Sequence, residues 1–161
     1  MLLEPLAELA AACCSQLGVV ADAELSLTLV DPTAIADLNE RYMGKAGPTD
    51  VLSFPVDDPD HVPAGAGGPP QMLGDIVICP EVAATNAPDH AGTLEDELAL
   101  LVVHGVLHLL GHDHIDHADA VRMHQQERSL LAALHRPVDL PEHRDTIGPA
   151  GDRPSAPGAT P

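Results

Sequence analysis

Residues 93–111 constrain the fold more than any other part of the chain, because they combine a helix start, a long apolar run and a helix stop. Thr93 followed by Asp96 resembles a capping box, which predicts that a helix begins there. Apolar residues continue at helical spacing to Leu110, and Gly111 is expected to end the helix. The segment therefore predicts one long helix whose leucines pack into the core.

Histidines on this helix and just beyond it have the spacing of a metal site. His104 and His108 are four residues apart, so their side chains lie about 40° apart on one helix face and reach the same ion. Gly111 lets the chain turn back and present His114. Three imidazoles leave the fourth tetrahedral position of Zn²⁺ to water, as in catalytic zinc sites. We predict one zinc per chain on these three histidines, with the zinc-bound water as the reactive group and no side-chain base identified.

The histidine spacing also fits two other interpretations. A lone pair of histidines four residues apart is more often a solvated helix face than a site, but the glycine and the third histidine at fixed offsets favour a site. The spacing HxxxHxxGxxH also matches the metzincin proteases. Enzymes with an HExxH motif place a glutamate, the general base, next to the first histidine, and this chain has Gly105 there. A cytosolic metalloprotease therefore stays an alternative on spacing alone.

The other elements follow from periodicity and turn signals. Helices are expected over residues 2–17, 31–44 and about 116–134, and strands over residues 24–30, 50–54 and 74–79. The second helix opens with Asp31 as N-cap and Pro32 at its first position. Residues 55–70 are rich in Pro, Gly and Asp and are expected to form a long exposed loop between two strands. This order predicts an α+β fold, a small mixed β-sheet packed against helices.

The length of the chain suits one domain with a hydrophobic core and is too short for two. Residues 1–136 are expected to form the zinc hydrolase domain. Residues 137–161 contain six prolines and few large apolar side chains, so they cannot offset the entropy lost on ordering. We expect a disordered tail there.

Composition narrows the possible functions. Seven Lys and Arg residues against 25 Asp and Glu residues give a net charge of −18, which repels polyanions at long range. One Tyr, one Phe and no Trp make an aromatic platform for stacking bases unexpected. Three cysteines without CxxC spacing fit a reduced, cytoplasmic protein, and the sequence shows no secretory signal and no membrane span. The charge thus argues against nucleic-acid binding, whereas the motifs below favour it.

The block HGVLHLLGHDH at residues 104–114, with PTDVLSFP at 48–55 and LGDIVIC at 73–79, resembles the YbeY family, and the match covers about residues 24–135. The resemblance implies a zincin-like α+β fold with a zinc on the three histidines. It also implies a single-strand endoribonuclease that matures rRNA, including the 3′ end of 16S rRNA, and serves ribosome quality control. The expected partners are an rRNA precursor or ribosomal particle and a ribosomal or GTPase protein, with no DNA and no membrane.

The chain departs from the family at two places. Many members carry Arg directly after the tyrosine that is Tyr42 here, and this chain has Met43. It also starts close to its first helix, without the N-terminal strand usual in the family. Phosphate neutralisation is then expected from Arg41 or Lys45. The change at Met43 makes a non-catalytic ribosome-assembly factor that keeps the zinc site a second alternative.

Four more polar residues lie in or next to the motifs. Thr49 and Ser53, at the turn and along the strand of the DVLSFP block, are candidates to line a substrate groove, although Thr49 is also a plausible turn cap. Asp113 is expected to accept a hydrogen bond from a ligand imidazole or a backbone amide. His112 is a weaker ligand candidate than His114, because the turn after the helix favours the latter.

Overall fold

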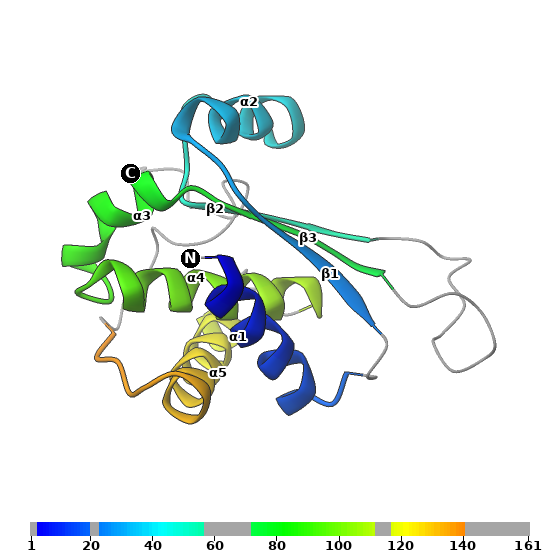
Figure 1. Cartoon of the computed structure of the whole chain (residues 1–161), viewed down its shortest axis with the longest axis vertical. Coiled ribbons are helices and arrows are strands. Elements are labelled where there is room, and N and C mark those ends of the chain that lie inside the picture. The colour runs from blue at the N-terminus through cyan, green and yellow to red at the C-terminus, as the bar shows by residue number, and fades with distance from the viewer. Residues whose placement is uncertain (1–2, 20–22, 57–71, 112–116, 141–161) are drawn as a thin grey trace.

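The structure is a computed structural model that describes residues 3–19, 23–56, 72–111 and 117–140 of the 161-residue chain. Its helices are α1 (Leu3–Gln16), α2 (Pro32–Met43), α3 (Pro80–Asn86), α4 (Leu94–Leu109) and α5 (His117–Leu134), with a 3₁₀ helix at Ala87–Asp89. Its strands are β1 (Glu24–Leu29), β2 (Val51–Pro55) and β3 (Met72–Ile78). The predicted α+β fold with a small mixed sheet is confirmed (Figure 1).

The three strands form one sheet in the order β1-β3-β2. The middle strand, β3, is parallel to β1 and antiparallel to β2. In the antiparallel pair Ser53 lies opposite Ile76. Because side chains alternate along a strand, Ser53 faces one side of the sheet and the next residue, Phe54, faces the other.

Helices cover both faces of this sheet (Figure 1). On one face, α2 packs through a small cluster that includes Ile35 of the helix and Leu52 of β2. On the opposite face lies α4, and α1, α3 and α5 pack against α4 in turn. Residues 96–109 of α4 are all buried, so this helix has no solvent-facing side. The fold is therefore assembled around α4.

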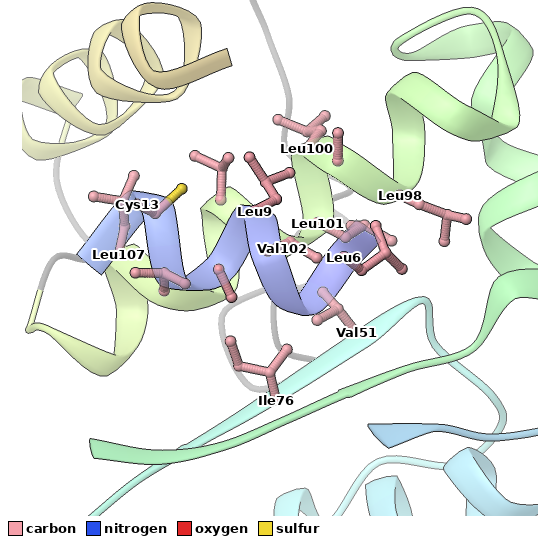
Figure 2. Packing of buried hydrophobic residues seen from close by; sticks show 14 of the residues in the cluster. Leu6, Leu9, Cys13, Val51, Ile76, Leu98, Leu100, Leu101, Val102 and Leu107 are labelled. Carbon is pink, nitrogen blue, oxygen red and sulfur yellow. The ribbon is translucent and has the colours of Figure 1, made fainter. Parts of the chain in front are cut away.

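The main core is aliphatic, as the scarcity of aromatic residues requires. Leu6, Leu9 and Cys13 of α1 are buried in this core beside the leucines and valines of α4 (Figure 2). Val51 and Ile76 belong to the same cluster and come from the sheet. Each fully buried Leu or Ile side chain contributes about 1.5–3 kcal/mol to stability. The core thus holds both α1 and the sheet against α4.

The predicted caps of α2 and α4 are present. Oδ1 of Asp31 accepts a hydrogen bond from the N–H of Ala34 at 2.8 Å. Oγ1 of Thr93 accepts one from the N–H of Asp96 at 3.1 Å. Gly44 ends α2 with a φ of 68°, a left-handed conformation that glycine adopts without strain. Local chemistry therefore sets where these two helices begin.

Neither α3 nor the 3₁₀ helix that follows it was predicted from the sequence. α3 has only seven residues, too few to show a helical period, and its start carries Pro80 and Glu81 but no side-chain cap. The other helices and strands begin and end within two residues of their predicted bounds. The expected loop at 55–70 falls almost wholly outside the described residues. Within the described part of the chain, no helix is long and apolar enough to cross a membrane.

Two buried acidic residues in the first turn of α4 have partners on neighbouring segments. Asp96 accepts two hydrogen bonds from the guanidinium of Arg136, at 2.7 and 2.8 Å, and one from Nε2 of His135 at 2.8 Å. The hydrogen bond from Arg136 lowers the pKa of Asp96 below its ordinary value. Oε2 of Glu97 lies 3.0 Å from Nδ1 of His90. These contacts join the start of α4 to the segment after α5 and to the chain before α4.

The described chain stays packed beyond the predicted domain boundary at residue 136. Leu140 is 4% exposed and belongs to the main core, and Val138 packs against that core. Residues 137–140 were expected to belong to the tail, since they have no periodic pattern, but they pack on the folded unit. Residues 141–161 lie outside the described residues, so the tail there stays a prediction.

Two truncations test where the folded unit ends. Removal of residues 141–161 is expected to leave the free energy of unfolding unchanged, because the described core keeps all its members. Removal of residues 137–161 also deletes Leu140. It is expected to lower the free energy of unfolding by about 2–5 kcal/mol, the range for loss of a buried leucine side chain. Urea denaturation of the full-length and truncated chains measures both values. Equal stability of the two truncations would contradict the boundary at residue 140.

Candidate active site

His104 and His108 lie side by side in the second half of α4. Their ring centroids are 4.6 Å apart, and the ring planes are inclined by 64°. The two residues are 3% and 9% exposed, so the pair lies inside the protein and not on a solvated helix face. Burial of imidazoles among aliphatic side chains is unfavourable unless their nitrogens form hydrogen bonds or bind a metal ion. The fold thus brings the first two predicted metal ligands together in a buried position.

A carboxylate from α5 orients the first of these histidines. Oε2 of Glu127 lies 2.5 Å from Nδ1 of His104, and both side chains are buried. A carboxylate on one ring nitrogen fixes the tautomer and directs the other nitrogen to the opposite side, the usual arrangement of histidines that bind a metal. Glu127 was not predicted from the sequence. Its position could have indicated a role, because Glu127 lies on the apolar stripe of α5, one turn after Met123 and one turn before Leu131, and both of these are buried.

The third predicted ligand, His114, and its neighbour Asp113 lie outside the described residues. In the part of the chain that is described, no group of three or more His, Cys, Asp or Glu side chains is placed to hold a metal ion. The zinc site therefore stays a prediction. The described residues fit it, because two buried imidazoles in contact, one of them bound to a carboxylate, are donors that zinc prefers.

Gly105, directly after the first histidine, is a point of close approach between α4 and the sheet. A Cβ atom at this position would lie 3.0 Å from both Cδ1 and Cγ2 of Ile76, which is fully buried in β3. A side chain here would fit only if Ile76 shifted within a close-packed core. The position that carries the general base in HExxH enzymes thus faces the sheet in this protein. This contact weighs against the metalloprotease alternative.

The groove candidates Ser53 and Thr49 have different surroundings. Ser53 is 4% exposed on the sheet face that α4 covers, and its Oγ has no hydrogen-bond partner within the described residues. Thr49 is buried beside Asp50, to which its hydroxyl donates a hydrogen bond of 3.3 Å. Asn86, at the end of α3, donates a hydrogen bond of 3.3 Å to the same carboxylate. Ser53 stays a groove candidate, whereas Thr49 belongs to a buried polar cluster between β2 and α3.

Arg41 and Lys45 lie apart from the histidines. Both are exposed at or just after the end of α2, which packs on the sheet face opposite α4 (Figure 1). Arg41 forms an ion pair of 2.9 Å with Asp37, one turn earlier on the same helix. The sheet therefore separates these two cations from the histidine pair. They reach a substrate only where it passes an edge or an end of the sheet.

A hollow of about 500 Å³ opens beside the histidine-bearing end of α4. Its lining comes from Gly111 and from α5 side chains that include Arg122, Met123 and Gln126. Met123 is one turn before Glu127, so the hollow adjoins the part of α5 that contacts His104. Its volume is in the range of small-ligand sites. The sequence contained no signal for it, because it depends on how α5 packs against α4.

Known proteins of one family match this chain. The family model for endoribonuclease YbeY matches residues 2–135. The Endoribonuclease YbeY of Salinispora tropica is 51% identical over 123 residues, which are 73% of this chain and 78% of the relative. That of Thermobifida fusca is 44% identical over 139 residues, which are 86% of this chain and 90% of the relative. That of Mycolicibacterium vanbaalenii is 53% identical over 111 residues, 68% of this chain and 60% of the relative.

A solved structure has the same architecture. The solution structure of TM1509 from Thermotoga maritima superposes with a TM-score of 0.58 at 30% sequence identity, and the match covers 83% of this chain and 81% of that one. The family model spans every described helix and strand, from α1 to α5. On the match of nearly the whole chain and on these identities, the chain belongs to the YbeY endoribonuclease family.

Proposed function

We propose that this protein is a zinc-dependent endoribonuclease that cuts single-stranded RNA in rRNA maturation, including the 3′ end of 16S rRNA. Ribosome quality control, a cytoplasmic location and a zincin-like site belong to the same proposal. The observation that carries it is the buried pair of His104 and His108 with Glu127 behind it, in a chain of the YbeY family. The relatives that match are named endoribonucleases, which makes RNA the substrate class.

His104, His108 and His114 would hold the zinc. When bound, zinc supplies a Lewis acid and lowers the pKa of a bound water towards 7. Glu127 holds the His104 ring in one orientation, and burial of the histidine pair limits the access of bulk water to the donor nitrogens. Because the chain has Gly105 next to the first histidine, proton removal from the nucleophile does not depend on a glutamate there.

The acidic chain restricts how the RNA is captured. The net charge is −18, and the cations that we propose to meet phosphates are Arg41 and Lys45, which are exposed at the end of α2 and just after it. We expect only about one to three phosphate contacts. Capture then relies on the rRNA precursor or ribosomal particle as a whole, and on a ribosomal or GTPase protein that brings the enzyme to it.

Cleavage assays decide between this function and its alternatives. The zinc-loaded protein is expected to cut a single-stranded rRNA-precursor fragment and to leave casein intact. His108→Ala is expected to lose RNA cleavage by about 100-fold or more, because a proposed ligand is removed. In cells, the same variant is expected to accumulate unprocessed 16S 3′ ends. Casein cleavage would support the metalloprotease, and zinc binding without RNA cleavage would support the non-catalytic assembly factor.

Zinc content tests the metal site independently of activity. The purified protein is expected to carry about one zinc per chain, and Ala at His104, His108 or His114 removes most of it. Glu127→Gln keeps the size of the side chain and removes its charge, so it is expected to lower zinc affinity by about 10- to 100-fold. Elemental analysis gives the occupancy, and competition with a chelator gives the affinity.

His135→Ala is the matched control for these variants. The His135 imidazole donates a hydrogen bond to Asp96 at the other end of α4, away from the histidine pair, so its loss is expected to leave zinc content unchanged. Equal zinc content in all the histidine variants would refute the site. Unchanged affinity in Glu127→Gln would refute the orienting role of the carboxylate alone.

The salt dependence of RNA binding tests how many phosphates the protein contacts. With one to three contacts, the logarithm of affinity is expected to fall with the logarithm of salt concentration at a slope of about 0.7–2. Naked RNA is then expected to be cut poorly compared with a pre-ribosomal particle. Fluorescence anisotropy with a labelled RNA at several salt concentrations gives the slope. Tight binding to naked RNA with a steep slope would show a basic surface other than Arg41 and Lys45.

A further inference from the structure

The chain has one Tyr, one Phe and no Trp, and the fold brings the two aromatic side chains together. The rings of Tyr42 and Phe54 meet edge to face, with centroids 5.5 Å apart and planes inclined by 69°. Aromatic pairs favour this geometry. Phe54 is half-buried against the cluster below α2, whereas Tyr42 is 60% exposed. The tyrosine ring is therefore supported by Phe54 and open to solvent over much of its surface.

The residues next to Tyr42 in the sequence suit an RNA strand. Residues 41–49 include two cations, Arg41 and Lys45, and no acidic residue, in a chain of net charge −18. Both cations are exposed, although Arg41 also pairs with Asp37 and directly follows the exposed Glu40. Sites for single-stranded nucleic acid combine aromatic rings, on which bases stack, with cations that meet the backbone phosphates. The exposed Tyr42 ring between two cations in sequence has both components.

The ring pair and the histidines lie near the same end of β2, on opposite faces of the sheet. A Cβ atom on Gly74 of β3 would clash with the carbonyl oxygen of Phe54 and lie 2.8 Å from Cδ2 of Leu109. Leu109 directly follows His108, so the backbone of Phe54 lies close to the histidine-bearing end of α4. β2 is an edge strand of the described sheet. An RNA strand that passes around this edge would meet the tyrosine on one sheet face and approach the histidines on the other.

We infer that Tyr42 stacks on an unpaired base of the RNA that is cut, with Phe54 supporting the ring. The inference rests on the proposed function, which supplies RNA as the ligand, and adds a binding residue on the sheet face opposite the histidines. Exposed aromatic rings also dock proteins. RNA is favoured here because the nearest basic residues in the sequence lie on both sides of the ring and no acidic residue lies among them.

The single tyrosine makes a direct test possible, because the tyrosine emission of this chain comes from Tyr42 alone. The full-length His108→Ala protein is used so that the probe is not cut. A single-stranded RNA of about ten nucleotides is expected to quench the emission until the site is saturated. An abasic strand of the same length and charge is expected to leave it nearly unchanged. Equal quenching by both strands would overturn the inference.

Substitutions of Tyr42 in the same protein measure the contribution of the ring. Tyr42→Ala is expected to weaken RNA binding by about 5- to 150-fold, and Tyr42→Phe, which keeps the ring, binds as the parent does. Tyr42→Leu keeps an apolar contact with Phe54 and is expected to lose affinity too. Val121→Ala, at a residue of α5 that is 41% exposed, is the matched control and binds RNA unchanged. Melting temperatures check that each variant is folded.

The outcomes separate this inference from the proposed function. Unchanged RNA affinity in Tyr42→Ala overturns the inference, and so does a loss confined to the binding of a ribosomal protein. Binding is measured in a cleavage-deficient protein, so neither result depends on nuclease activity. Base-dependent binding together with no RNA cleavage by the wild-type protein would refute the proposed function and support the stacking site.

Discussion

Helix α4 is buried along residues 96–109, so the polar groups that it carries must find partners inside the protein. Asp96 and Glu97 at its start bind side chains after α5 and before α4, and His104 near its end binds Glu127 on α5. A buried polar group left without its partner costs about 1–3 kcal/mol. Each pair therefore holds a neighbouring segment on α4, and the orientation of the candidate site follows from the same packing.

The close contact between α4 and the sheet also limits the chemistry. Gly105 leaves little room for a side chain against Ile76, and Gly74 leaves none between Phe54 and Leu109. The first contact disfavours a glutamate base at the position where HExxH enzymes carry it. The second contact, at Gly74, brings Phe54 near the end of β2 close to Leu109 at the end of α4. The same tight packing thus argues against one mechanism and joins two parts of a proposed RNA path.

An RNA-cutting enzyme with a net charge of −18 needs contacts that do not depend on long-range attraction. Base stacking is such a contact, because it acts at short range and tolerates any base. One exposed ring at Tyr42 and two nearby cations would give weak, local recognition, in line with the proposed capture of a ribosomal particle. The composition that made a base-stacking platform unexpected is compatible with a single ring, since the fold places its only two aromatic residues side by side.

The sequence by itself determined the features that depend on neighbours along the chain. The caps at Asp31 and Thr93 are local, and the structure confirms both of them. The four-residue spacing of His104 and His108 is also local, and it places the two rings side by side on α4. The contact of Glu127 with His104 joins residues on two helices, and the sheet that separates Lys45 from the histidines is built from strands far apart in sequence. Only the tertiary structure decided these, because hydrophobic packing is non-directional and no local pattern specifies which buried surfaces meet.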